Sequence, residues 1–383
     1  MTAVSPGHPP RSHRPATDGA TKRTFILDKS AMYCDSLPGK KNKDSFYGEA
    51  AMKVVQRAAS VGVAAIVLQG VMLIAFAWPA SNIEPQDLPV VVAGPQAEVV
   101  SDRLSRLAPG AFEVTVVADA EQARGLIADR QAYGAIVTEG GGSGSGDQAR
   151  VMVASAASPA VAQQLTRMAE QISGAREAAA EDVVASDRDD PTGGGFAAMV
   201  LPLVVSSLVA GYLLALAVPS IGARMAGLAI YAFGAGLSSA AVVRGWLSLA
   251  PGSFLAVAAA IALISVSVSA TIVAAGAVAG RIGLGVAGFT FLLLGNPLSG
   301  ASTGPEMLPQ PWGRIGQLLP PGAGASLLRS VMFFDGAAAG IPFTILLAWV
   351  AAALTILTLL ALAGARHHPA RNSSQAPKAA ATQ

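Results

Sequence analysis

The sequence of 383 residues is poor in charged and aromatic side chains, and it contains a single cysteine. Charged residues make up 13% of the chain, whereas soluble domains carry roughly a quarter. Hydrophobic residues make up 52%, and the mean hydropathy is +0.50. These values nearly exclude a water-soluble enzyme and favour an integral membrane protein. Cys34 has no partner for an intrachain disulfide, which excludes a disulfide-stabilised fold.

Several motifs of common enzyme classes are also missing. The chain has no G-x-x-x-x-G-K-[ST] phosphate loop and no H-E-x-x-H zinc motif. The glycine-rich run 140–146 lacks the lysine and the following helix of a phosphate cradle, so we interpret it as a flexible linker. His367 and His368 could bind a metal weakly, but a pair beside arginines more often marks a solvated segment flanking a membrane. We therefore predict no enzyme and no catalytic, cofactor-binding or metal-binding residue.

Charge is distributed unevenly along the chain. Residues 1–57 hold ten basic and five acidic side chains, and residues 80–195 hold eight arginines, no lysine and seventeen acidic side chains. A nucleic-acid-binding protein would carry a basic folded domain, whereas the folded polar part here is acidic, so we predict no nucleic-acid partner. Residues 1–44 lack any apolar period and are interpreted as a disordered basic tail, for which contact with anionic membrane lipid is an alternative role.

Six uncharged apolar stretches are long enough to cross a membrane. A stretch of about 20 helical residues spans the hydrocarbon layer of roughly 30 Å. The fourth and fifth stretches are separated only by Gly280-Arg281, and together they are too long for one crossing, so the arginine is expected to mark a turn. The expected spans are Ala58–Trp78, Phe196–Ser220, Met225–Val243, Phe254–Ala279, Ile282–Leu298 and Ile341–Gly364.

The positive charges predict the orientation of these helices. With the basic tail in the cytoplasm, the acidic region 80–195 lies outside the cell membrane. Arg224, Arg281 and Arg366 then fall on the cytoplasmic side. Among the short loops, only Arg244, Arg314 and Arg329 fall on the outer side. The prediction is a multi-pass protein of the cell membrane with both termini in the cytoplasm.

The outer region 80–195 alternates strand and helix patterns, which is typical of βαβ units with a parallel sheet. The expected strands are Leu88–Ala93, Phe112–Val117, Tyr133–Thr138 and Arg150–Ser155, and the expected helices are Gln96–Ala108, Ala120–Arg130 and Ala160–Ile172. The predicted fold is thus an α-helical membrane protein with six transmembrane helices and a small α/β extracytoplasmic domain between helices 1 and 2. The predicted organisation is a tail (1–44), an amphipathic lead-in with helix 1 (45–79), the outer domain (80–195), helices 2–5 (196–298), an outer interfacial loop (299–340), helix 6 (341–365) and a cytoplasmic tail (366–383).

The later helices contain no ionisable side chain, which disfavours a carrier driven by protons or ions. Their small polar residues suggest close helix packing, with a mildly polar lining for an amphiphilic substrate as the alternative. These residues are Ser265, Ser267, Ser269 and Thr271, with Gly276 and Gly280 as a small-xxx-small pair. Pro202 predicts a kink in the second predicted helix, and Pro342 is expected in the first turn of the last one.

The loop 299–340 has an amphipathic pattern that predicts a short helix at the outer interface. Trp312, Ile315 and Leu319 share one face, while Arg314 and Gln317 lie off it. The run Pro320-Pro321-Gly322 is expected to break this helix, and Ser326–Phe334 to form a second one. A pocket or a gate is the alternative role for this loop.

Four short phrases resemble those of ABC-2-type membrane permeases of the phage-infection-protein (YhgE/Pip-like) group. They are Tyr133–Val137, Val153–Ser158, Gly295–Gly300 and Leu318–Gly322. The similarity extends over roughly residues 50–365, although the outer domain here is shorter than in many relatives. The resemblance implies a permease subunit of an exporter that pairs with a separate cytoplasmic ABC ATPase, often as a homodimer, and it implies no catalytic residues.

Two function classes follow. One is a permease that depends on an ATPase partner, and the other is a membrane-anchored interaction or scaffold protein whose acidic outer domain binds a partner. A permease needs a helix on the inner face that receives the ATPase. Ser45–Arg57 is the amphipathic candidate, with Tyr47, Ala50, Ala51 and Val54 at helical spacing, although Gly48 also fits a frayed lead-in.

Overall fold

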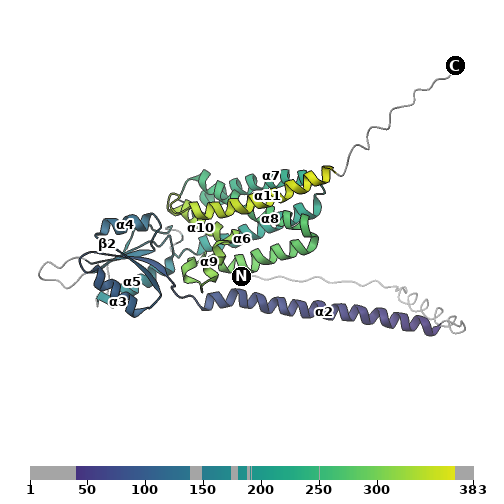
Figure 1. Cartoon of the computed structure of the whole chain (residues 1–383), viewed down its shortest axis with the longest axis horizontal. Coiled ribbons are helices and arrows are strands. Elements are labelled where there is room, and N and C mark those ends of the chain that lie inside the picture. Colours follow the sequence, from purple (N-terminus) through teal and green to yellow (C-terminus); the bar gives the residue numbers. More distant parts are fainter. Residues whose placement is uncertain are drawn as a thin grey trace, which may run out of the picture. The chain divides into compact units, whose positions relative to one another are not determined.

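The computed structural model describes residues 40–138, 149–173, 180–187, 190, 192–249 and 251–366. It contains five helices that are long and apolar enough to cross a membrane, and a small α/β region between the first of them and the rest (Figure 1). The chain divides after Gly70 into two compact units. Cys34, the glycine run 140–146, His367 and His368 lie outside the described residues.

The first long helix, α2 (Lys40–Ser81), is uninterrupted over 42 residues. Its part that is long and apolar enough to cross a membrane is Ala51–Ser81, which contains the predicted span Ala58–Trp78. The side chains from Ala51 to Leu68 are all exposed. Since most of them are apolar, this part of α2 needs lipid or another protein around it.

The α/β region is a five-stranded mixed sheet in the order β2-β1-β3-β4-β5. Its elements are β1 (Leu88–Ala93), α3 (Ala97–Leu107), β2 (Phe112–Val117), α4 (Ala120–Ala128), β3 (Gly134–Thr138), β4 (Ala149–Val153), α5 (Pro159–Ser173) and β5 (Ala180–Asp182). β1 pairs in parallel with β2 and β3, so that Val92 lies opposite Val116 and Ile136. β4 is antiparallel to β3, which corrects the prediction of a parallel sheet, and β5 was not predicted.

Helices cover both faces of this sheet, with α4 on one face and α3 and α5 on the other (Figure 1). β1 supplies apolar side chains to both layers, because successive residues of a strand point to opposite faces. Val91 packs on the α4 side, whereas Val90 and Val92 pack on the α3 and α5 side. Phe334 and Met307, from the later part of the chain, complete the two cores. The sheet is therefore tied to the helical region by buried side chains.

The helical region is built around α8 (Phe254–Phe289), which continues through a π-helical turn, η2 (Thr290–Gly295). Helices α6 (Gly194–Ala217), α7 (Ile221–Ala240, extended by the π-turn η1, Ala241–Trp246) and α11 (Gly340–Arg366) all pack on α8. Pro202 lies inside α6, and Pro342 lies in the first turn of α11.

The backbone of α8 leaves helical geometry at Gly280, where φ is 57° and ψ is −135°. A side chain would strain this conformation, so glycine is required there. The Leu284 side chain lies against Gly276, and Phe291 packs with Val268 and Ile272. In a straight helix, residues so far apart in sequence could not touch. The chain therefore reverses direction at Gly280, and the two parts of α8 pack side by side.

The segment between η2 and α11 forms four short helices: η3 (Pro297–Ser299), η4 (Pro305–Met307), α9 (Trp312–Gln317) and α10 (Pro320–Phe333). α9 contains Trp312 and Ile315 of the predicted short helix, both exposed, but it ends at Gln317, so Leu319 lies outside it and precedes α10. α10 begins at Pro320, six residues before the predicted start. The two prolines were expected to break the preceding helix, but they occupy the first turn of α10, where proline fits well. α10 is buried against α8 and α11.

The hydroxyl groups of Ser267, Ser269 and Thr271 bond to the backbone of α8, whereas that of Ser265 has no hydrogen-bond partner among the described residues. Ser269 donates to the carbonyl oxygen of Ser265 at 2.7 Å, and Thr271 donates to that of Ser267 at the same distance. Ser265, Ser267 and Ser269 are all buried. This arrangement agrees with the packing interpretation rather than with a polar lining. Gly276 contacts Leu284, but Gly280 serves the turn, so the two glycines do not act as a packing pair.

Candidate functional site

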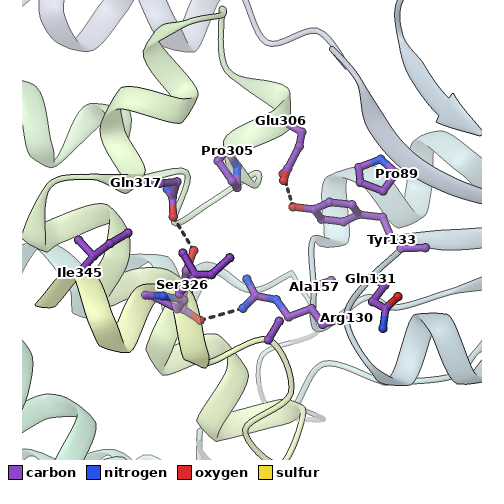
Figure 2. A pocket seen from close by; sticks show the side chains of 14 residues that line it. Pro89, Arg130, Gln131, Tyr133, Ala157, Pro305, Glu306, Gln317, Ser326 and Ile345 are labelled. Atoms are coloured by element: carbon purple, nitrogen blue, oxygen red, sulfur yellow. Dashed lines mark hydrogen bonds between the residues drawn. The ribbon is translucent and has the colours of Figure 1, made fainter. Parts of the chain in front are cut away.

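The main cluster of buried and half-buried polar side chains lies where the α/β region meets α9 and α10. It surrounds a cavity of about 270 Å³ (Figure 2). The wall on the sheet side comes from β1, the turn after α4 and the loop before α5, and the opposite wall comes from η4, α9, α10 and the start of α11. The polar lining residues are Arg130, Gln131, Tyr133, Glu306, Gln317 and Ser326.

Arg130 lies just after the end of α4, in a backbone conformation that usually requires glycine. Its φ is 56°. Its amide donates to the carbonyl of Ile127, and the next amide, of Gln131, donates to that of Leu126. This is the Schellman pattern of helix termination, in which glycine commonly occupies the position that Arg130 has here. For an arginine the left-handed conformation costs about 1–2 kcal/mol, so the side chain must contribute elsewhere.

The Arg130 guanidinium reaches from the sheet region into the helical region. Its Nη1 donates to the carbonyl oxygen of Ser326 at 2.8 Å and to the hydroxyl of Ser330 at 2.6 Å. Its carbon Cζ lies 5.8 Å from the centroid of the Phe334 ring. Burial lowers the pKa of Arg130, while Tyr133 and Glu306 oppose this shift. The two hydrogen bonds join α10 to the end of α4.

Tyr133 forms a second link between the two regions. Its hydroxyl donates to Glu306 Oε2 at 2.5 Å (Figure 2). Burial raises the pKa of Tyr133, and the neighbouring Glu306 carboxylate raises it further. Gly304, with φ of 98°, lets the chain pass close to the tyrosine, because a Cβ there would lie 2.6 Å from the hydroxyl oxygen.

Arg130 and Glu306 enter the cavity from different directions in Figure 2. No ion pair joins them, although both side chains are in the described part of the chain. Arg130 Nε and Nη2 and Glu306 Oε1 make no hydrogen bond to any described residue. The cavity therefore presents one cationic and one anionic group that do not neutralise each other directly.

Arg329 is a second buried cation next to this cluster. It is 3% exposed. Its Nη2 donates to the carbonyl oxygen of Ala301 at 2.6 Å, and its Cζ lies 4.6 Å from the centroid of the Phe196 ring. Its Nε has no hydrogen-bond partner among the described residues. Burial and the neighbouring Arg130 lower the pKa of Arg329 to about 10, so it remains charged at neutral pH.

The sequence interpretation did not single out any of these contacts. Arg329 was placed in a short outer loop, whereas it is buried inside the helical region. The sequence does single out Glu306 in one respect: it is one of only two acidic residues after residue 195. Among the described residues, no group of three or more His, Cys, Asp or Glu side chains could hold a metal ion.

The segment Gly300–Gly304 has the spacing G-x-S-x-G that occurs at the nucleophile of α/β-hydrolases. Its serine, Ser302, is exposed and lies on a turn between η3 and η4. The hydrolase motif requires a tight turn from a strand into a helix. The match in spacing is therefore no evidence that Ser302 is a hydrolase nucleophile.

Arginines also lie at the ends of the apolar helices. Arg224, near the start of α7, donates from Nε to the carbonyl oxygen of Val218 at 2.7 Å and from Nη2 to that of Ala215 at 2.9 Å. It thus satisfies carbonyl groups at the end of α6 that have no partner within the helix. Arg281 directly follows the reversal of α8, and Arg244 lies in the π-turn after α7.

No family model, no curated protein and no solved structure matches this chain. The resemblance to ABC-2-type permeases therefore stays a prediction from short sequence phrases. Function has to be argued from the geometry of the molecule and from its charge distribution.

Proposed function

We propose that the chain is the membrane subunit of an ABC-2-type exporter, which relies on a separate cytoplasmic ATPase to move an amphiphilic substrate. The observation that carries this proposal is the continuity of α2. The span Ala58–Trp78 uses about half of this helix. The part from Lys40 to Arg57 continues as the same helix for about 27 Å. A partner that binds this extension could therefore act directly on a helix that crosses the membrane.

The arrangement of the other helices supports six crossings with both termini in the cytoplasm. The reversal at Gly280 returns the chain to the side from which α8 started. Arg224, Arg281 and Arg366 then share one side with the basic tail, in keeping with the excess of positive charge in cytoplasmic loops. The acidic α/β region lies on the other side. A cell-membrane protein of this topology presents α2 to a cytoplasmic partner.

The exposed apolar surfaces support contact with membrane lipid and with a second copy of the chain. Only about a quarter of α6, α7 and α11 is buried within the described chain. Large apolar side chains such as Ile230, Phe233 and Ile341 are more than 70% exposed. Lipid chains cover such surfaces in a membrane, and a homodimer would cover part of them.

A second candidate function is that of a membrane-anchored interaction protein. β2 lies at an edge of the sheet, with Val116 47% exposed. An open edge strand can pair with an extended segment of another protein. In this alternative the acidic outer domain binds a partner, and the membrane helices serve as an anchor.

Capture of the ATPase tests the proposal. The stripe formed by Tyr47, Ala50, Ala51 and Val54 is the expected contact surface. We expect that native membranes treated with a cross-linker yield the chain together with an ATPase whose sequence contains a phosphate loop. Tyr47→Asp combined with Ala51→Asp should abolish this capture, because burying two carboxylates in an apolar contact is costly.

The matched control places the same two charges on the other side of the helix. Met52 and Gln56 are exposed and lie off the stripe. Met52→Asp combined with Gln56→Asp should retain the captured ATPase and the normal amount of protein in the membrane. Equal loss of capture in both double variants would contradict docking on the stripe. Capture of no ATPase by the native chain would favour the interaction protein.

A further inference from the structure

The cavity between the α/β region and α10 contains two opposite charges that are held apart. Arg130 is positioned by its bonds to Ser326 and Ser330, and Glu306 is positioned by its bond to Tyr133. Figure 2 shows the bonds to Ser326 and from Tyr133. Both residues line the cavity, and each has a polar side-chain atom without a hydrogen bond to any described residue. Flexible side chains of opposite charge would normally approach each other to form an ion pair. Here the bonds to neighbouring residues keep the two charges apart.

A ligand with a single charge fits this arrangement poorly. An anion at Arg130 would meet the nearby carboxylate of Glu306, and a cation at Glu306 would meet the nearby guanidinium of Arg130. Each would pay for desolvation and gain only one of the two attractive interactions. A molecule that carries both charges satisfies both groups at once, and it leaves the net charge of the cavity unchanged.

The size and the remaining walls of the cavity restrict the ligand further. A volume of about 270 Å³ lies just below the range of roughly 300–1,000 Å³ that is typical of sites for drug-sized molecules. Apolar groups of Ile341, Pro342 and Ile345 line the side formed by α11. The ligand is therefore small and has an apolar part next to its charges.

We propose that this cavity binds a small zwitterion, with its anionic group at Arg130, its ammonium group at Glu306 and its apolar part against α11. Such a ligand bridges the turn after α4 and the segment around η4, so it would join the outer domain to the helical region. The site does not depend on whether the chain exports a substrate. It was not evident from the sequence, because the two charged residues lie 176 positions apart.

Two sources could supply this chemistry: a free amino acid, or the headgroup of a phospholipid such as phosphatidylethanolamine. Calorimetric titration of the full-length protein distinguishes them. The protein is placed in nanodiscs of phosphatidylglycerol, whose headgroup carries no ammonium, and is titrated with leucine and with glycerophosphoethanolamine. Repeating the titration in nanodiscs that contain phosphatidylethanolamine shows whether membrane lipid occupies the site, since bound lipid would weaken the binding of either probe.

The charge requirement is tested with two analogues of leucine. Isopentylamine lacks the carboxylate, and 4-methylpentanoate lacks the ammonium. We expect at least one zwitterion to bind about tenfold or more tightly than both analogues, because each analogue loses one charged hydrogen-bonded contact. No binding of either zwitterion at millimolar concentration would overturn the proposal, and so would equal binding of a singly charged analogue.

Substitutions locate the site. Glu306→Gln keeps an acceptor for Tyr133 but removes the charge, and Arg130→Gly removes the guanidinium at a position whose backbone suits glycine. Each should weaken binding about tenfold or more. Arg314→Gln is the control, since Arg314 forms an exposed ion pair with Asp87 outside the cavity. Binding that survives both cavity substitutions would place the ligand elsewhere and overturn the proposal.

Discussion

Replacement of Arg130 by glycine separates the effect of the backbone from that of the side chain. The variant loses two charge-assisted hydrogen bonds, to Ser326 and Ser330, worth about 1.5–3 kcal/mol each. It also gains about 1–2 kcal/mol, because glycine adopts the left-handed conformation without strain. The net loss is about 3 kcal/mol, within a range of about 1–5 kcal/mol. This loss weakens the contact between α4 and α10, whereas the glycine caps the end of α4 better than arginine does.

Hydrogen exchange of the full chain in nanodiscs measures both effects. A loss of about 3 kcal/mol raises the opening equilibrium by about a hundredfold, since each 1.4 kcal/mol is a factor of ten. Amides of α10 should therefore exchange faster in Arg130→Gly, while the capping amides at positions 130 and 131 keep their protection or gain some. Ser330→Ala should produce a smaller change of the same kind, and Arg314→Gln none. Unchanged exchange in α10 would refute the argument that this side chain holds the two regions together.

Three further predictions concern topology, ionisation and the outer domain. In a Cys34→Ser background, cysteines at Ser145 and Asn296 should react with an impermeant thiol reagent on intact cells, and a cysteine at Arg281 only after permeabilisation; a straight α8 would place the last two on the same side. Burial raises the pKa of Tyr133 above its ordinary value of 10, so the folded state is favoured below about pH 10 and loses this contribution as the pH rises further. At pH 11 Tyr133 should be protonated in the folded protein and ionised in the unfolded protein. Tyr133→Phe should therefore leave the phenolate absorbance of the folded protein unchanged and lower that of the unfolded protein; an equal decrease in both states would contradict the raised pKa of Tyr133. Residues 82–190 expressed alone should give an α/β circular dichroism spectrum with low thermal stability, because Met307 and Phe334 are missing from its cores; a random-coil spectrum would contradict an independently folding domain.

Local sequence patterns predicted the elements whose structure depends on local interactions. β1 and β2 have the predicted bounds, because short apolar runs between turn residues specify strands. The antiparallel direction of β4 was missed, because the strand–helix alternation that precedes it favoured parallel pairing throughout. The start of α10 was misplaced because two prolines fit either a helix break or a first turn.

The candidate site depends on contacts between residues far apart in the sequence. Tyr133 and Glu306 are separated by 173 positions, and Arg130 and Ser330 by 200. No periodicity or spacing can indicate such pairs in a single sequence. The reversal at Gly280, in contrast, was predictable, because two apolar stretches separated by one glycine and one arginine are too long for a single crossing.

The proposed permease draws its energy from ATP hydrolysis by a separate partner. The most direct measurement compares ATP hydrolysis by the purified chain with hydrolysis by the complex cross-linked and purified from its native membrane. We expect no hydrolysis by the chain alone and hydrolysis by the complex. Absence of an ATPase from the complex would contradict this proposal, as would movement of a substrate by the chain alone down an imposed proton gradient in proteoliposomes.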